Sequence, residues 1–204
     1  MIGIINYGSG NVQAIANIYN RTNFQYKIIQ DPEQLKTVDK LILPGVGDFD
    51  ETIKVLDSSG LRNALNEEVL VKKKPVLGIC VGMQILSNDS EEGSQKGLGW
   101  INGNVKKFDI LKIKDKPFIP HMGWNNVEPK FNHVLFKKID IELGFYFVHS
   151  YYFQTFSSNN ILGNTFYGEE FTSAVFNDNI FGVQFHPEKS HSNGIQLLSN
   201  FATI

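Results

Sequence analysis

The stretch Val76–Gln84, which reads VLGICVGMQ, decides the fold class. Val76–Ile79 is an apolar run typical of a buried strand, and a helical pattern begins after Cys80. The form G-x-C-x-G at such a junction resembles the G-x-S-x-G turn, which carries a nucleophile between a strand and a helix. A glycine on each side leaves room in a turn where a Cβ would not fit. The stretch therefore predicts an α/β fold with Cys80 on a tight strand-to-helix turn.

The residues before this stretch alternate between strand and helix patterns. Asp31, Pro32 and Gln34 form a predicted capping box that starts one of the helices. Parallel strands joined by helices give a sheet covered on both faces. The expected strands are Ile2–Ile5, Tyr26–Ile29 and Lys40–Leu43, and the expected helices run through Val12–Tyr19, from Asp31, through Phe49–Leu56 and through Leu61–Leu70.

The residues after this stretch predict an antiparallel continuation of the sheet. Asn102-Gly103 between Leu98–Ile101 and Asn104–Phe108 is a strong hairpin signal. Asp178-Asn179 predicts a turn between the last two strands, and Ile195–Phe201 a closing helix. Residues 1–204 are thus expected to form one three-layer α/β domain, with a parallel sheet and an antiparallel C-terminal extension. The further strands expected in that extension are Phe145–Val148, Ile161–Tyr167, Phe171–Phe176 and Ile180–Phe185.

Composition excludes several classes of protein. A formal net charge of −2 over 204 residues offers no positive excess for phosphates, so we expect no nucleic-acid partner. The single cysteine excludes an internal disulfide and every multi-cysteine zinc pattern, and we expect neither a metal nor a cofactor. The N-terminus lacks the pattern of a signal peptide, and Pro75–Leu86 is too short to span a bilayer. We therefore expect a cytoplasmic protein with no membrane contact.

A thiol nucleophile needs a base, and the base needs an orienting group. Among five histidines, His186 directly follows the strand Ile180–Phe185 and precedes Pro187 and Glu188. A carboxylate two positions on can hold the imidazole tautomer. The order Cys80, His186, Glu188 therefore predicts a nucleophile, its base and an orienting carboxylate. A small buried core cysteine and a strand-end turn remain the plainer readings of each motif alone.

Attack on a carbonyl also needs N–H donors for the developing oxyanion. The turn offers the N–H of Val81. The segment Pro44–Gly47 (PGVG), after the third strand, could offer a second donor from Val46 or Gly47. Glycines that merely turn the chain are an equally good reading of this segment.

These motifs together resemble the class I glutamine amidotransferases. The resemblance rests on Pro44–Gly47, Gly78–Gln84 and Phe185–Ser190 and runs from Ile2 to Phe201. Further segments are similar to one subfamily, the glutaminase subunits that serve histidine biosynthesis. They are Asn6–Asn11, Glu91–Gly93 with Gly97–Gly99, Pro120–Asn125 and Tyr146–Tyr151.

The resemblance implies the chemistry and the partner. Cys80 would attack the side-chain amide of L-glutamine, His186 would move the proton, and Glu188 would orient His186, releasing glutamate and ammonia. A separate (β/α)8-barrel cyclase subunit would receive the ammonia and form a heterodimer with the chain. The family pattern implies an oxyanion site at Val46, Gly47 and Val81, a substrate site at Gly45, Gln84, Glu92, Ser150 and Tyr151, and a partner interface at Met122, Trp124, Asn125 and Lys189.

Two alternatives stay open at the level of sequence. A paralogous glutaminase could supply ammonia for the amidation of surface polysaccharides, since it would need the same site and a similar barrel. A catalytically silent subunit could only bind and regulate the barrel. The intact set Cys80, His186 and Glu188 argues against a silent subunit.

Overall fold

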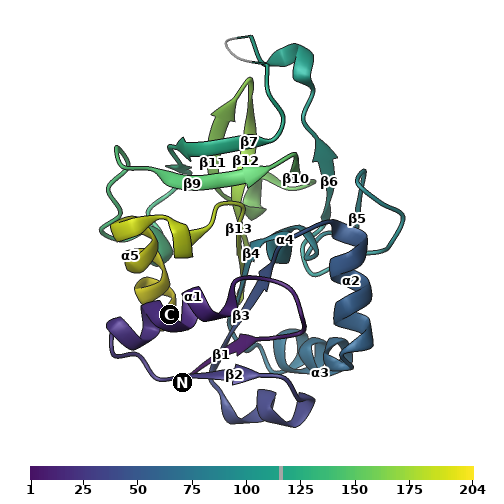
Figure 1. Ribbon diagram of the computed structural model, residues 1–204, viewed down its shortest axis with the longest axis vertical. Helices are drawn as coiled ribbons and strands as arrows, with labels where there is room; N and C mark the ends of the chain where they lie inside the picture. The colour runs from purple at the N-terminus through teal and green to yellow at the C-terminus, as the bar shows by residue number, and fades with distance from the viewer. Residues whose placement is uncertain (115–116) are drawn as a thin grey trace.

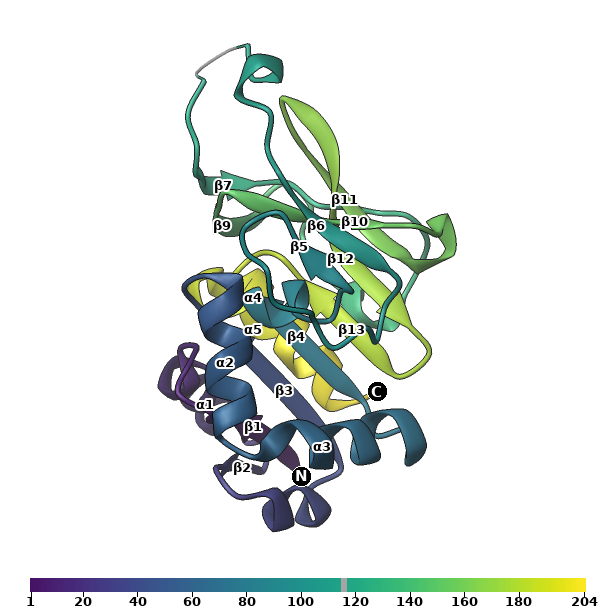
Figure 2. The same ribbon diagram turned by 90° about the vertical axis from the view of Figure 1, so that its right-hand side faces the viewer.

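Five short apolar strands form the parallel part of the central sheet. The computed structural model describes residues 1–114 and 117–204, and in it these strands lie in the order β2-β1-β3-β4-β13 (Figures 1 and 2). Every residue of β1 and β4 is buried, as expected for strands covered on both faces. Their bounds are β1 (Ile2–Ile5), β2 (Tyr26–Ile29), β3 (Lys40–Gly45), β4 (Val76–Cys80) and β13 (Ile180–Val183).

Helices cover both faces of this sheet, as predicted. Figure 1 shows α1 (Val12–Arg21) and α5 (His191–Ala202) on one side of the strands, and α2 (Phe49–Ser58) and α3 (Leu61–Asn66) on the other. The predicted capping box forms, although it starts a 3-10 helix, η1 (Pro32–Thr37). The helix predicted up to Leu70 ends in a π turn, η2 (Glu67–Val71). Among the described residues, no helix combines the length and apolarity that a bilayer crossing would need.

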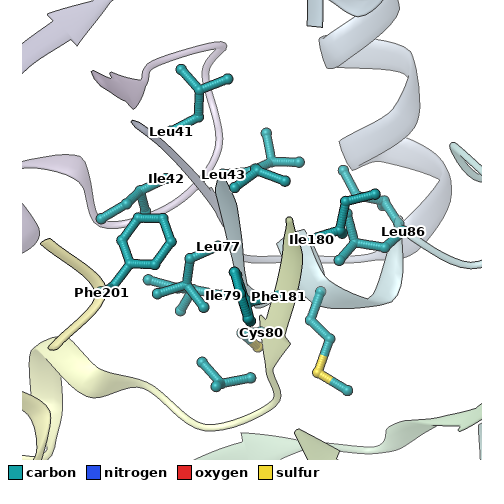
Figure 3. Close-up of a cluster of buried hydrophobic side chains, with 14 of the residues drawn as sticks. Leu41, Ile42, Leu43, Leu77, Ile79, Cys80, Leu86, Ile180, Phe181 and Phe201 are labelled. Carbon is teal, nitrogen blue, oxygen red and sulfur yellow. The ribbon is translucent and has the colours of Figure 1, made fainter. Parts of the chain in front are cut away.

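The hydrophobic core lies against the strands that carry the predicted site. Figure 3 shows its centre, where side chains from β3, β4, β13 and α5 meet beside Cys80. Each fully buried Leu, Ile or Phe contributes about 1.5–3 kcal/mol relative to an exposed one. The end of β4 is therefore held rigidly. The side chains labelled besides Cys80 are Leu41, Ile42, Leu43, Leu77, Ile79, Leu86, Ile180, Phe181 and Phe201.

The antiparallel extension predicted for the C-terminal half is present. β12 (Glu169–Asn177) pairs antiparallel with β13, and β11 and β10 pair antiparallel with β12. The remaining strands and short helices of the described chain are α4 (Val81–Gln84), β5 (Asp89–Ser90), β6 (Gly103–Lys107), η3 (Ile110–Lys112), β7 (His121–Asn125), β8 (Glu128–Pro129), η4 (Val134–Phe136), β9 (Phe145–His149), β10 (Tyr151–Thr155), η5 (Ser158–Asn160), β11 (Ile161–Tyr167) and η6 (Pro187–Lys189).

One predicted strand belongs to a different sheet. Phe145–Val148 does form β9, but within residues 1–114 and 117–204 its one strand partner is β7, in a separate two-stranded sheet. Its burial alternates, with Phe145, Phe147 and His149 buried. The prediction that Phe145–Val148 joins the main sheet was therefore wrong. The backbone hydrogen bonds of β9 go to β7, and its apolar face covers the core.

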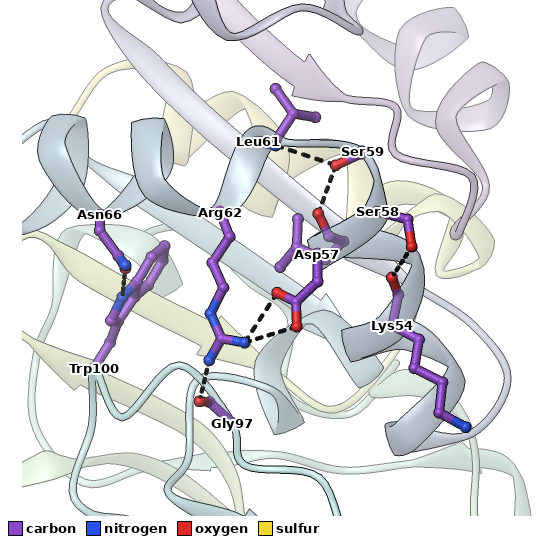
Figure 4. A network of polar contacts seen from close by, with 10 residues as sticks. Lys54, Asp57, Ser58, Ser59, Leu61, Arg62, Asn66, Gly97 and Trp100 are labelled. Carbon is purple, nitrogen blue, oxygen red and sulfur yellow. Dashed lines mark hydrogen bonds and ion pairs between the residues drawn. The ribbon is translucent and has the colours of Figure 1, made fainter.

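The predicted hairpin at Asn102-Gly103 was also wrong. Its second arm is β6, which pairs with β10 and β5, but Leu98–Ile101 is not a strand. The N–H groups of Leu98 and Trp100 instead donate to the carbonyls of Ile85 and Leu86, after α4. Figure 4 shows how α3 holds this loop: Arg62 donates to the Gly97 carbonyl at 2.7 Å, and Trp100 Nε1 donates to Asn66 Oδ1 at 2.8 Å.

Candidate active site

Cys80 lies on the tight turn that the sequence predicts. Its backbone has φ 56° and ψ −114°, a conformation that costs a non-glycine residue on the order of 1–3 kcal/mol. A Cβ on Gly78 would lie 2.5 Å from the Gly82 carbonyl oxygen, and a Cβ on Gly82 would lie 1.9 Å from that of Leu43. Both flanking glycines are therefore required by close backbone approach.

The helix after this turn is too short to stabilise a thiolate strongly. α4 contains only the four residues Val81–Gln84. A helix dipole sums over aligned peptides, so one turn supplies only a small part of the dipole of a longer helix. Side chains around Cys80 must therefore supply most of any stabilisation of its thiolate.

His186 supplies the nearest charged partner. It follows β13, is 2% exposed, and has its Nδ1 2.9 Å from Glu188 Oε1. Burial lowers the pKa of His186, but the hydrogen bonds to Cys80 and Glu188 outweigh burial and raise its pKa to about 10. The ring can therefore take up and hold a proton between a sulfur and a carboxylate. Such a group can return a proton to a leaving amine.

Ser190 fixes the loop that carries His186. Its Oγ donates to the His186 carbonyl at 2.6 Å and accepts from the Tyr146 N–H at 3.0 Å. The His186 N–H donates to the Tyr146 carbonyl at 2.9 Å. The histidine is thus tied to β9, from the small second sheet. Sequence reasoning quoted Ser190 in its motif but assigned it no role.

A cavity of about 380 Å³ opens over Cys80 and His186. It has the size of a small-molecule site. Most predicted site residues line it, while Gly45 and Glu188 lie behind this lining. Gly45 is the register partner of Cys80 and packs on the Gly82 amide, and Glu188 contacts His186. The lining residues are Val46, Gly47, Cys80, Val81, Gln84, Glu92, Pro120, Val148, His149, Ser150, Tyr151, His186 and Lys189.

The predicted oxyanion donor Val46 is occupied in this conformation. Its N–H donates to Ser9 Oγ at 2.9 Å, and the Ser9 hydroxyl lies 2.9 Å from the Val46 carbonyl oxygen, to which it donates. The next residue, Gly47, has φ +101°, and a Cβ there would meet no atom within 4 Å. Gly47 therefore gives the Val46–Gly47 peptide freedom to turn, and Ser9 holds the peptides on both sides of Val46 in one orientation.

The rest of the Asn6–Asn11 loop supports the same segment. Tyr7 Oη donates to the Pro44 carbonyl at 2.6 Å. A Cβ on Gly10 would lie 2.5 Å from Pro44 Cβ, so only glycine fits. Sequence reasoning missed this support, and its one signal was the glycine-flanked Ser9.

The cavity has a negative corner at Glu92. Its Oε2 accepts from the Phe49 N–H, the first of α2, at 2.9 Å. Burial raises the pKa of Glu92, the Phe49 N–H lowers it, and Asp48 and Asp50 raise it further. Three neighbouring carboxylates favour a cationic group, such as an α-ammonium, at this end of the cavity.

The predicted partner residues lie on the outer side of the cavity. Met122 is 62% exposed and Trp124 47% exposed, both on β7. Lys189 lines the cavity mouth, with Nζ 5.7 Å from the ring centroid of Tyr146. Asn125 is different, because its side-chain nitrogen already donates to the Phe166 carbonyl at 2.9 Å.

Known proteins resemble this chain over its whole length. A family model described as "Glutamine amidotransferase class-I" matches residues 3–204. The "Imidazole glycerol phosphate synthase subunit HisH" of Leptospira interrogans is 48% identical over 204 residues, 100% of each chain. The "Imidazole glycerol phosphate synthase subunit HisH 2" of Methanococcus maripaludis is 50% identical over 201 residues, 98% of each chain.

A solved structure shows the same fold. It is described as "Crystal structure of glutamine amidotransferase" and superimposes with a TM-score of 0.73 at 17% identity, covering 100% of this chain and 99% of the other. The cysteine turn, the histidine–glutamate pair beside it and the match over residues 3–204 lead to one conclusion. The chain belongs to the class I glutamine amidotransferase family.

Proposed function

We propose that this chain is the glutaminase subunit of an imidazole glycerol phosphate synthase and acts in L-histidine biosynthesis. It is a glutamine amidotransferase that hydrolyses L-glutamine to glutamate and ammonia. The observation that carries the proposal is that Cys80 and His186 line a 380 Å³ cavity and that Glu188 binds His186 from behind this lining. The full-length likeness to HisH subunits supports the choice of pathway.

The proposed reaction begins when the Cys80 thiol gives its proton to His186. The Cys80 thiolate attacks the side-chain carbonyl carbon of glutamine and forms a C–S bond, and the π electrons of the carbonyl bond move onto its oxygen. The tetrahedral intermediate then collapses, and the His186 imidazolium gives its proton to the leaving nitrogen, which departs as ammonia. His186 next takes a proton from water, which attacks the γ-glutamyl thioester and releases glutamate. Glu188 holds the ring at Nδ1 throughout.

The cavity wall supplies the proposed contacts to glutamine. Glu92 accepts from the α-ammonium, while Ser150 and Tyr151 line the cavity where β9 leads into β10. Gln84 offers only its carbonyl oxygen, because both of its side-chain hydrogens already bind within the protein, to Tyr151 O and Gln184 Oε1. Gly45 leaves space for the turn beside Cys80.

The oxyanion donors are the N–H groups of Val81 and of Val46 or Gly47. Because Ser9 holds the Val46 N–H, the resting site lacks this donor until the peptide turns. Removing one such donor typically lowers the rate by about 10²–10³-fold. The isolated subunit is therefore a poor glutaminase.

The partner is a (β/α)8-barrel cyclase subunit that forms a heterodimer with the chain in the cytoplasm. The exposed side chains of Met122 and Trp124 lie on β7, and Lys189 lies at the cavity mouth. Asn125 contributes to this surface mainly by fixing the backbone of β7, since its amide binds within the chain. Residues 1–204 act as one glutaminase domain in this complex.

Reconstitution tests the proposal. The chain is mixed with the histidine-pathway barrel subunit of the same organism and its nucleotide substrate. Glutamine should then support ring product, and Cys80→Ser should lose this activity but keep product formation with ammonium salt. Turnover only with a barrel protein of polysaccharide amidation would reassign the pathway, and no glutamate release with either would reject the glutaminase.

A further inference from the structure

A buried glutamine touches the sulfur of Cys80. Gln184 follows β13, two positions before His186, and is 0% exposed. Its Nε2 donates to Cys80 Sγ at 3.7 Å. It is a polar side chain in an otherwise apolar run, Ile180–Phe185, and sequence reasoning gave it no role. A fully buried amide is costly unless it is hydrogen-bonded, so its place at the sulfur calls for a reason.

The hydrogen-bond network fixes which end of this amide faces the sulfur. Gln84 Nε2 donates to Gln184 Oε1 at 3.0 Å and to the Tyr151 carbonyl at 3.0 Å. Turning Gln84 over would place its oxygen against both of these acceptors. Gln184 Oε1 is therefore committed to Gln84, and the Gln184 amide presents its N–H group to Cys80.

The network continues away from the sulfur in one direction. His149 Nδ1 lies 2.7 Å from the Tyr151 carbonyl, which can only accept. His149 Nε2 is therefore the acceptor for His121 Nδ1, 2.9 Å away. His121 Nε2 in turn accepts from Asn125 Nδ2 at 3.1 Å. Every ring nitrogen in this series has a matching partner, so the series holds the Tyr151 carbonyl and, through it, Gln84.

A sulfur anion buried in this way needs donors. Hydrogen bonds to a charged acceptor are roughly twice as strong as neutral ones. His186 offers one donor, and the single turn of α4 offers little. Gln184 adds a fixed donor from the strand below, which also restricts the rotation of the thiol.

We propose that Gln184 is a further residue of the catalytic site, which holds the Cys80 thiolate by donating its side-chain N–H to Sγ. The catalytic part of this role rests on the proposed glutaminase function, whereas the hydrogen bond to Sγ can be tested without it. Gln84 positions Gln184, and Gln184 positions the sulfur toward the carbonyl carbon of the substrate.

Alkylation of Cys80 tests the proposal without glutamine. Iodoacetamide reacts with the thiolate, so its rate against pH reports the ionisation of Cys80. Gln184→Met and Gln184→Leu remove the donor without adding an ionisable group. Each should shift the midpoint upward by about one pH unit, since one charge-assisted hydrogen bond is lost. Ionisable groups that also face this site are Tyr7, Glu92, His149, Tyr151, His186, Glu188 and Lys189.

Gln196→Met is the matched control. Gln196 is a half-buried amide on α5 that donates to Asn200 Oδ1 at 2.8 Å, away from the cysteine. This variant should alkylate as wild type does. An unchanged midpoint in folded Gln184 variants would overturn the proposal, whether or not the subunit hydrolyses glutamine.

A second measurement avoids any change at Gln184. In wild-type protein labelled with ¹⁵N at glutamine side chains, the Gln184 amide protons should shift in NMR spectra as Cys80 ionises or is alkylated. The same signals should stay still in Cys80→Ser over that pH range. Gln184 amide signals that do not shift when Cys80 of the wild type ionises or is alkylated would refute the hydrogen bond. If the wild-type chain with its partner released no glutamate, the proposed function would be rejected but the hydrogen bond to Cys80 would not.

Discussion

Ser9→Ala should raise the basal glutaminase rate of the isolated subunit. The Ser9 hydroxyl holds both the N–H and the carbonyl of Val46, each at 2.9 Å. Without it, the two peptide groups that flank Val46, Gly45–Val46 and Val46–Gly47, each lose the bond that favours the resting orientation. Val46 is 47% exposed, so water replaces part of each bond and the freed groups remain solvated.

The magnitude follows from these two bonds. At about 0.5–1 kcal/mol each, they favour the resting orientation by about 1–2 kcal/mol. That corresponds to a change of about 5- to 30-fold in the population with a free donor. The basal rate should rise by the same factor and stay below the limit of about 10²–10³-fold set by one oxyanion donor. The rate with saturating partner should not change, because the partner already selects the turned peptide.

Glutamate release, measured with and without the barrel partner, checks this prediction. Ser58→Ala is the matched control, since Ser58 Oγ donates to the Lys54 carbonyl at 2.7 Å on the outer helix α2 (Figure 4). The control should keep both rates. A folded Ser9→Ala subunit with the basal rate of wild type would refute the idea that Ser9 restrains the donor.

Three further predictions follow from the site. Burial lowers the pKa of His121 to about 4 and that of His149 to about 3, so both stay neutral in the folded protein but bind protons in the unfolded one. The free energy of unfolding should therefore decrease as the pH falls below about 6.5, by up to ~1.4 kcal/mol per pH unit for each histidine. Urea titrations at several pH values should find a smaller decrease in His149→Asn. His186 has the opposite sign: its raised pKa contributes stability in full below about 6.5 that is lost as pH rises toward about 10, so wild type should lose more stability than His186→Gln between pH 7 and 10. Lys189→Ala should weaken partner binding or let ammonia escape, so that glutamate formed exceeds ring product formed while Cys80 still reacts with a glutamine analogue. An unchanged ratio of glutamate to ring product, together with an unchanged affinity for the partner, would show that Lys189 is an ordinary surface residue.

The sequence predicts the parallel half of the fold well because its signals are local. β1 and β2 have the predicted bounds, since each is a short, mostly apolar run followed by turn residues. β7 was not predicted, because His121–Asn125 mixes glycine with polar residues and is a strand only through pairing with β9. The strand prediction for Leu98–Ile101 was wrong for the converse reason. Residues in α3 and after α4, which are distant in the sequence, form hydrogen bonds with its polar groups.

The site follows the same division. Cys80, His186 and Glu188 lie in short motifs whose order along the chain is informative, and the structure brings them together. The contacts of Ser9 with Val46 and of Gln184 with Cys80 join residues 37 and 104 positions apart. No spacing rule connects such pairs, so only the folded backbone reveals them.

One measurement tests the central claim most directly, that this cysteine site supplies ammonia to a barrel partner. The complex is given glutamine labelled with ¹⁵N in its side-chain amide, together with the nucleotide substrate and an excess of unlabelled ammonium. The account predicts that the ring product carries the ¹⁵N label in wild type and none in Cys80→Ser, which still forms unlabelled product. Wild-type product without the label, despite glutamine consumption, would contradict it.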